Sequence, residues 1–218
     1  MSTDSKGKNI PTFKVLLVGD SCVGKTSLLI RFKDRIFLKG TYISTVGIDY
    51  KAKVVNANGI PVQLKIWDTA GQEKFRSLTK SYYRDSNAVV LVYDISRMDT
   101  LLHTKSWMDE ITGNADSKTL LLLAGNKADE ARERAVSKRD GERVAKECGA
   151  LFWETSAKTG QNVDAMFHSV AETLLSSSAS ESPVDENGFT LPNDKIGSTD
   201  SEPSNRTRLS GNIFRCCH

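Results

Sequence analysis

The fold is decided by residues 19–26, which read Gly-Asp-Ser-Cys-Val-Gly-Lys-Thr and match the pattern G-x-x-x-x-G-K-[ST]. An apolar run at 13–18 predicts a buried strand before this stretch, and a helical pattern follows it at 25–33. In that context the glycines let backbone N–H groups converge on phosphate oxygens at the helix N-terminus. Lys25 would neutralise β- and γ-phosphates, and the Thr26 hydroxyl would ligate Mg²⁺. The alternative, a plain glycine-containing turn, does not require all four fixed positions.

The same alternation of strand and helix continues to about residue 175. Further apolar runs with the length of buried parallel strands lie at 89–95, 120–124 and 151–154. Further helical patterns lie at 100–112, 137–147 and 162–175. Two other strands, 46–55 and 62–67, are joined across the turn residues 56–59 and predict a hairpin. The order predicts an α/β fold with about six mostly parallel strands, one antiparallel edge strand and helices on both faces.

Composition excludes several classes of protein. The chain has 218 residues with 30 basic and 27 acidic side chains, a balance that argues against a nucleic-acid partner. Four cysteines are too few for a disulfide framework, and the first twelve residues lack the apolar segment of a secretory signal. We therefore expect a protein of the reducing cytosol.

The character of the chain changes after residue 175. Residues 176–218 contain nine serines and three of the five prolines, with almost no apolar periodicity. Such a segment buries too little apolar surface to offset the entropy of ordering. The predicted organisation is a flexible N-terminus at 1–11, one domain at 12–175 and a disordered tail at 176–218.

A second motif closes the hairpin, where residues 67–72 read Trp-Asp-Thr-Ala-Gly-Gln. A carboxylate at a strand's carboxyl end lies beside the phosphate loop of a parallel sheet, so Asp68 can orient Mg²⁺ and its water. Gly71 permits its N–H to approach a γ-phosphate, and Gln72 can orient an attacking water. Alone, Asp-x-x-Gly is usually a turn. Its place after the phosphate loop makes it informative.

A third motif, Asn126-Lys127-Ala128-Asp129, follows the apolar run 120–124. The Asp129 carboxylate can accept hydrogen bonds from guanine N1–H and the N2 amino group, which adenine cannot offer. The alternative is a polar loop with an N-capping aspartate. Ser156-Ala157-Lys158, after the last strand, would offer a backbone N–H to guanine O6, although this triplet alone carries little information.

Together these motifs resemble those of Ras-like small GTPases. Residues 19–26, 67–72, 126–129 and 154–158 have the order and spacing of that family. Tyr42 to Tyr50, with the ending Cys216-Cys217-His218, looks like the Rab branch. Within it, residues 37–50 most resemble the group linked to regulated secretion.

The resemblance implies a P-loop GTPase domain that binds GTP or GDP with Mg²⁺ and hydrolyses GTP slowly as a switch in vesicle trafficking. Gln72, Lys25 and Thr45 would be catalytic, and Thr26, Thr45 and Asp68 would hold the metal. Phe37 would lie against the guanine, with core packing as the alternative. The implied nucleotide-binding residues are Ser21, Cys22, Val23, Gly24, Lys25, Thr26, Ser27, Phe37, Thr45, Gly71, Asn126, Lys127, Asp129, Ser156, Ala157 and Lys158.

The chain departs from the Rab pattern at two positions that bear on function. Lys74 replaces the usual arginine and keeps a cation without the bidentate fork. Tyr50 stands where Rabs usually place phenylalanine, in an effector-facing trio with Trp67 and Tyr82. Its hydroxyl either alters effector choice or is merely tolerated in the strand.

The resemblance also implies partners. The sequence shows no arginine built into the domain for the transition state, so an activating protein would supply one. An exchange factor would release GDP, and Rab effectors would bind the GTP form.

The chain's end predicts a membrane anchor. Cys216 and Cys217 would accept two geranylgeranyl groups from the prenylation machinery, with a carrier protein for the cytosolic pool. A vicinal disulfide and a metal fragment are the alternatives. The expected location is the cytoplasmic face of intracellular membranes, with secretory vesicles or Golgi as candidates.

Two other functions remain open: a GTP-dependent scaffold that scarcely hydrolyses, and another P-loop enzyme such as a nucleotide kinase or ATPase. Gln72 argues against the first and residues 126–129 against the second. We interpret His103 and His168 as surface or packing residues, because they lie in helical patterns without a cluster of partners.

Overall fold

The computed structural model describes residues 10–40, 45, 48–69 and 82–180, and the six strands within them form one sheet. The sheet order is β2-β3-β1-β4-β5-β6. The strands are β1 (Thr12–Val18), β2 (Ile48–Ala57), β3 (Ile60–Thr69), β4 (Ala88–Asp94), β5 (Leu120–Asn126) and β6 (Leu151–Glu154). β2 and β3 are antiparallel, and the other neighbouring strands run parallel. The predicted α/β fold with an antiparallel edge strand is confirmed.

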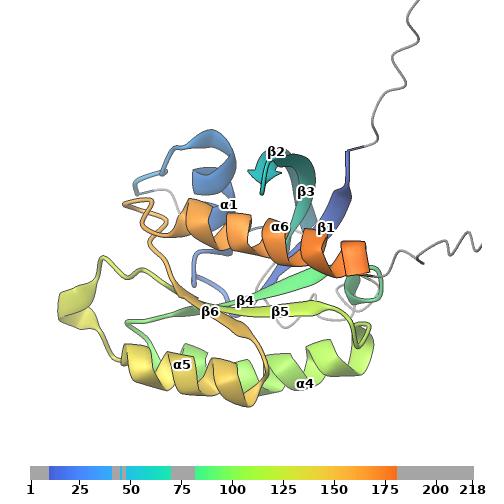
Figure 1. The fold of residues 1–218 in the computed structure, drawn as a ribbon. Coiled ribbons are helices and arrows are strands. Elements are labelled where there is room, and N and C mark those ends of the chain that lie inside the picture. The colour runs from blue at the N-terminus through green and yellow to red at the C-terminus, as the bar shows by residue number, and fades with distance from the viewer. Residues whose placement is uncertain (1–9, 41–44, 46–47, 70–81, 181–218) are drawn as a thin grey trace, which may run out of the picture. The chain divides into compact units, whose positions relative to one another are not determined.

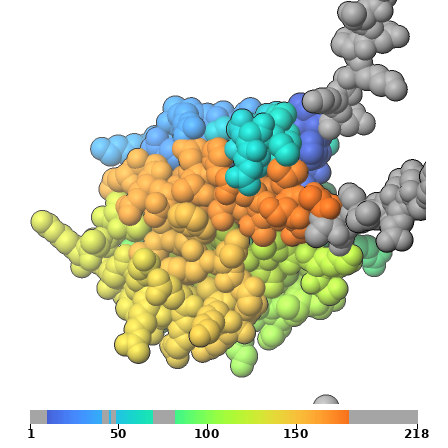
Figure 2. All heavy atoms as spheres, in the orientation of Figure 1, coloured from blue at the N-terminus to red at the C-terminus, as the bar shows by residue number. Residues whose placement is uncertain are grey.

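Helices cover both faces of the sheet. They are α1 (Lys25–Asp34), α3 (Met98–Leu102), α4 (Thr104–Asn114), α5 (Lys138–Glu147) and α6 (Val163–Ser180), with a 3₁₀ turn at Ala131–Glu133. Figure 1 shows α1 and α6 on one side of the sheet and α4 and α5 on the other. The space-filling view shows α6 in orange packed against α1 and β2 (Figure 2).

The two faces explain why the central strands read as continuous apolar runs. In β1, Val15 and Leu17 point into the core beneath α1 and α6, whereas Leu16 and Val18 point into the core with α3, α4 and α5. A strand buried on both faces has no polar side to alternate with. Phe32 of α1 and Phe167 of α6 stack in the first core with ring centroids 4.2 Å apart.

The single helix predicted at 100–112 is two helices that meet at His103, so that prediction is wrong in detail. At the junction, the Thr104 hydroxyl donates to the backbone carbonyl of Leu101 at 2.5 Å. At the start of α3, the Thr100 hydroxyl donates to the carbonyl of Arg97 at 2.7 Å. Such bonds offer the backbone an alternative to a continuous helix. The sequence pattern alone did not reveal this break.

The last helix extends five residues beyond its predicted end at Leu175. Three consecutive serines continue it, and each hydroxyl donates to a carbonyl of the preceding turn. The serine hydroxyls therefore find hydrogen-bond acceptors within the helix itself. Within the described residues, no helix combines the length and apolarity needed to cross a membrane.

Gly141→Ala tests the packing of α5 on the sheet. A Cβ at this position would lie 2.3 Å from Tyr93 Oη and 2.7 Å from Phe152 Cε2. We expect the free energy of unfolding to fall by about 2 kcal/mol, because overpacking outweighs the gain in helix propensity.

The matched control is Gly113→Ala in α4, where an added Cβ meets nothing within 4 Å. It should raise the free energy of unfolding by about 0.5 kcal/mol. Both values come from urea unfolding, and a Gly141→Ala variant as stable as the control would contradict the packing.

Candidate functional site

The phosphate loop of residues 19–24 leaves the carboxyl end of β1 and leads directly into α1. Two glycines make its path possible. A Cβ at Gly19 (φ 129°) would lie 2.2 Å from Val92 O, and one at Gly24 (φ 96°) would lie 2.4 Å from Asn126 Nδ2. Any residue larger than glycine at these two positions would clash with Val92 or Asn126. The loop leads into the N-terminal end of α1, which is a favourable place for phosphate.

Lys25 is buried at the centre of this loop. Its Nζ donates to Gly19 O at 2.7 Å and to Asp20 O at 2.8 Å, and the residue is 5% exposed. Burial lowers the pKa of Lys25 to about 8, against the opposing charges of Asp68 and Asp20. A cation that two carbonyls hold away from water is well suited to receive an anionic ligand.

Three oxygen-bearing side chains meet next to Lys25. Thr26 Oγ1 donates to Asp68 Oδ2 at 2.5 Å and lies 2.8 Å from Thr45 Oγ1, which is 3.3 Å from the same carboxylate oxygen. Asp68 is fully buried, and its Oδ1 has no hydrogen-bond partner within the described structure. Burial raises the pKa of Asp68, while Thr26 and Lys25 oppose that effect. Hydroxyl and carboxylate oxygens are the ligands that Mg²⁺ prefers, so these residues fit such an ion.

Asn126 joins the phosphate loop to the loop after β6. It is 1% exposed; its Nδ2 donates to Val23 O at 2.8 Å, and its Oδ1 accepts from Ala157 N–H at 3.2 Å. Arg31 of α1 supports the same loop, because its guanidinium donates to Ala157 O at 2.7 Å and Lys158 O at 2.6 Å. Neither role was predicted from the sequence.

Asp129 stands beside this junction. Its Oδ1 accepts from Ser156 Oγ at 2.6 Å, and Lys158 Nζ lies 3.1 Å from its Oδ2. Burial alone would raise the pKa of Asp129, but the bonds from Ser156 and Lys158 outweigh it and hold the pKa below its usual range. Lys127, in a left-handed conformation (φ 66°), places Nζ 2.6 Å from the buried Asp94 Oδ2. The Asp129 carboxylate is thus ionised at neutral pH and held in place by Ser156 and Lys158.

The structure also brings the predicted aromatic trio together. Ring centroids lie 5.0 Å apart for Tyr50 and Trp67, and 5.3 Å apart for Trp67 and Tyr82. Lys14 Nζ lies 5.7 Å from the Trp67 centroid and 5.2 Å from that of Tyr82, a cation–π arrangement that the sequence did not suggest. Tyr50 is 44% exposed, so a partner can reach it.

Phe37 packs against the edge of the core beneath α1 and α6 but is only partly buried, so its predicted contact with guanine stays a prediction. Gly71, Gln72, Cys216 and Cys217 lie outside the described residues.

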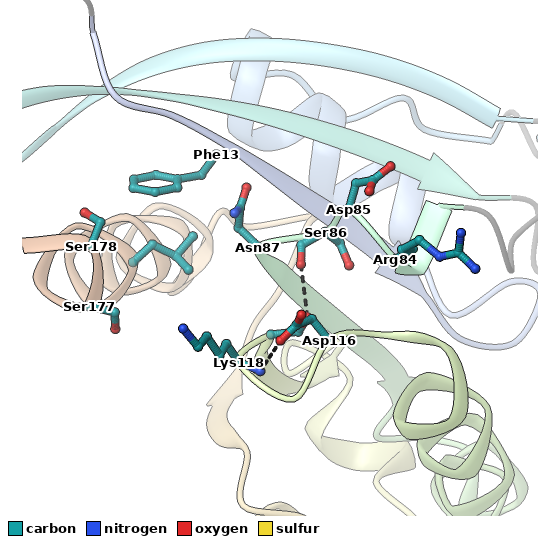
Figure 3. A pocket seen from close by; sticks show the side chains of 11 residues that line it. Phe13, Arg84, Asp85, Ser86, Asn87, Asp116, Lys118, Ser177 and Ser178 are labelled. Atoms are coloured by element: carbon teal, nitrogen blue, oxygen red, sulfur yellow. Dashed lines mark hydrogen bonds between the residues drawn. The ribbon is translucent and has the colours of Figure 1, made fainter. Parts of the chain in front are cut away.

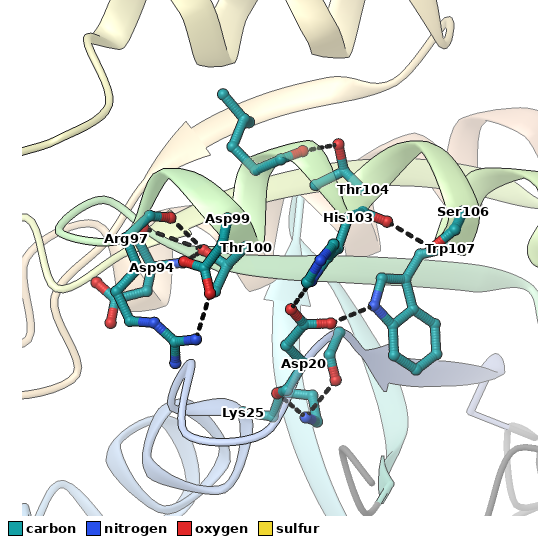
Figure 4. A network of polar contacts seen from close by, with 12 residues as sticks. Asp20, Lys25, Asp94, Arg97, Asp99, Thr100, His103, Thr104, Ser106 and Trp107 are labelled. Carbon is teal, nitrogen blue, oxygen red and sulfur yellow. Dashed lines mark hydrogen bonds and ion pairs between the residues drawn. The ribbon is translucent and has the colours of Figure 1, made fainter. Parts of the chain in front are cut away.

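The interpretation of His103 as a plain surface or packing residue is wrong. Its Nδ1 lies 2.6 Å from Asp20 Oδ2 in the phosphate loop (Figure 4). The two residues are 83 positions apart, so no local pattern signals the contact.

A cavity of about 310 Å³ lies at the opposite end of the strands (Figure 3). It opens near the amino ends of β1, β4 and β5, whereas ligands of such sheets bind at the carboxyl ends. Two of its polar side chains are already engaged: Asn87 Oδ1 accepts from the backbone N–H of Lys14, and Asp116 Oδ1 accepts from that of Lys118. It is therefore not the candidate site.

Comparison with known proteins agrees with this geometry. The Ras family matches residues 14–176. The chain is 54% identical over 167 residues to Ras-related protein Rab-26 of Mus musculus, covering 77% of this chain and 64% of that protein. It is 51% identical over 163 residues to Rab-37 of Homo sapiens, covering 75% and 73%. Rab-13 of Mesocricetus auratus is 42% identical over 194 residues, covering 89% and 92%. The chain thus spans less than two thirds of Rab-26.

The buried state of Lys25 predicts a pH dependence of stability in protein stripped of nucleotide and divalent cations. Between pH 8 and 10.5 the unfolded chain still holds a proton on this side chain that the folded protein has released. The contribution of Lys25 to the free energy of unfolding therefore rises with pH across this window, by about 3 kcal/mol, and is constant below it.

The measurement is urea unfolding over this pH range for the parent and for Lys25→Met, which removes the titrating amine. The difference between the two isolates Lys25 from other lysines. Parallel pH profiles would show that Lys25 is not perturbed in the folded state.

Proposed function

Because the chain belongs to the Rab branch of the Ras family of small GTPases, we propose that it is a GTP/GDP switch that hydrolyses GTP and recruits effectors in vesicle trafficking. The observation that carries the proposal is the joined site, in which Asn126 links the phosphate loop to Ala157 beside the fixed carboxylate of Asp129. Asn126 thereby fixes the loop assigned to the phosphates relative to the loop assigned to the guanine base.

Guanine selectivity is assigned to Asp129. Ser156 and Lys158 keep its carboxylate ionised and oriented, so it can accept from guanine N1–H and the N2 amino group. Adenine offers no such pair of donors, and an unmatched partly buried carboxylate is costly. Ala157 N–H would contact guanine O6, and Phe37 would line the base.

The phosphates are assigned to the loop and to α1. Lys25 and the N–H groups of residues 21–27 neutralise and bind them, as at other helix N-termini. Thr26, Thr45 and Asp68 would hold Mg²⁺, which would add charge neutralisation at the phosphates. Gly71 would add an N–H to the γ-phosphate.

Hydrolysis then depends mainly on positioning. Gln72 and the Thr45 carbonyl orient the attacking water, and Lys25 stabilises the developing charge. Because the sequence shows no arginine built into the domain for the transition state, we expect the protein to hydrolyse GTP slowly, with a rate constant on the order of 10⁻⁴ s⁻¹. An activating protein supplies that arginine, and an exchange factor releases GDP.

The GTP form is read by effectors on the surface of Tyr50, Trp67 and Tyr82, next to Lys14. Aromatic side chains with one polar atom are common anchors of protein interfaces. The likeness of residues 37–50 to the branch linked with regulated secretion supports a narrower assignment to exocytosis of secretory granules.

Nucleotide turnover tests the proposal. The parent should bind GDP about 10⁴-fold more tightly than ADP and convert GTP, not ATP, to its diphosphate. Gln72→Leu should keep GTP binding yet lose stimulation by an activating protein, because water is no longer oriented. Bound nucleotide is measured by chromatography over time. Equal turnover of ATP, or full stimulation of Gln72→Leu, would contradict these assignments.

Membrane attachment is assigned to Cys216 and Cys217. Two prenyl chains anchor stably, whereas one gives marginal binding. A fluorescent N-terminal fusion should mark intracellular membranes in secretory cells, and the Cys216→Ser, Cys217→Ser double variant should be diffuse. Cys148→Ser is the matched control, since this half-buried thiol lies in the folded domain. Identical images of parent and double variant would refute the anchor.

A further inference from the structure

The side chain of Asp20 points away from the phosphate loop and is held by two residues at the junction of α3 and α4. His103 Nδ1 lies 2.6 Å from Asp20 Oδ2, and Trp107 Nε1 donates to Asp20 Oδ1 at 2.8 Å. Both carboxylate oxygens are thus engaged, and the Asp20 side chain is 17% exposed. Figure 4 shows the carboxylate directed at His103 and Trp107, with Lys25 on its other side.

The two partners form a rigid clamp. They lie four residues apart and so share one helix face at the junction of α3 and α4. The backbone N–H of His103 donates to the carbonyl of Asp99 at 2.9 Å, and the backbone N–H of Trp107 donates to the carbonyl of His103 at 3.2 Å. Trp107 is 3% exposed, so its indole is fixed by packing.

A carboxylate in a phosphate-binding loop requires such restraint. If the Asp20 carboxylate turned toward the ligand, its charge would repel the phosphates strongly, because the distance is short and little water screens the charges. Its backbone is also part of the site, because Asp20 O accepts from Lys25 Nζ at 2.8 Å. Fixing the Asp20 side chain therefore keeps a repulsive charge turned away from the ligand and fixes a carbonyl that positions Lys25.

We propose that His103 and Trp107 are positioning residues for nucleotide binding: by holding Asp20, the junction of α3 and α4 sets how long a guanine nucleotide stays bound. This inference rests on the proposed function, because it concerns the same phosphate loop. It adds a second support for that loop, from the core on the other face of the sheet.

The release rate of a fluorescent GDP from the full-length protein tests the proposal. Trp107→Phe keeps the buried ring and removes the donor, so release should be about tenfold faster. His103→Ala removes a half-exposed bond, so release should be about threefold faster. Lys105→Ala, which removes an exposed cation of the same helix, should release GDP at the parental rate.

Two further measurements separate positioning from general destabilisation. His103→Asn should restore slow release, because its amide can donate near the position of Nδ1. In an Asp20→Ala background, His103→Ala and Trp107→Phe should cause no further acceleration, since the group that they hold is gone. In parallel, the NMR resonance of the Trp107 indole N–H should shift in Asp20→Ala, which reports the contact independently of release.

Parental release rates in Trp107→Phe and His103→Ala, or equal acceleration with and without Asp20, would overturn the inference and leave the proposed function intact. An unshifted indole resonance in Asp20→Ala would also overturn it. A parent protein that does not bind guanine nucleotide would instead remove the proposed function, and the inference with it.

Discussion

The functional edge of the sheet depends on the buried amide of Asn126. This one side chain donates to Val23 O and accepts from Ala157 N–H, so it joins loops that follow β1, β5 and β6. If the loops separated, the buried amide of Asn126 would lose these hydrogen bonds without regaining water, at a cost in free energy. This cost favours the arrangement in which Asn126 contacts both loops. The space it occupies also explains Gly24, since a Cβ at that position would overlap the amide.

Around this junction the protein keeps charges in places where water is scarce. Lys25 and Asp68 are both buried, and burial shifts their pKa values toward the neutral forms, downward for the amine and upward for the carboxyl. Protein groups leave the Asp68 carboxylate incompletely satisfied, because its Oδ1 has no hydrogen-bond partner within the described residues. A nucleotide with its metal ion would supply the missing partners, which is the physical basis for tight binding that we propose.

The two cores give this edge its support. α1 and α6 pack on one face, and from there Arg31 reaches the carbonyls of Ala157 and Lys158. On the other face, His103 and Trp107 reach Asp20. The base-recognition loop is therefore tied to α1, whose first turn also binds the phosphates in our proposal. The phosphate loop is tied to the junction of α3 and α4, which makes no contact with the ligand in our proposal. Such ties let changes in helix packing alter nucleotide binding.

Sequence by itself determined the sheet, its antiparallel edge strand and the motifs at the strand ends, because the apolar runs of buried strands and the period of helices are local patterns. It also placed Thr26 and Asp68 in one cluster, since carboxyl ends of parallel strands share an edge. It did not reveal the break at His103 or the bond from His103 to Asp20, 83 residues away. Contacts of that kind depend on how helices pack across the sheet, so only the tertiary structure decided them.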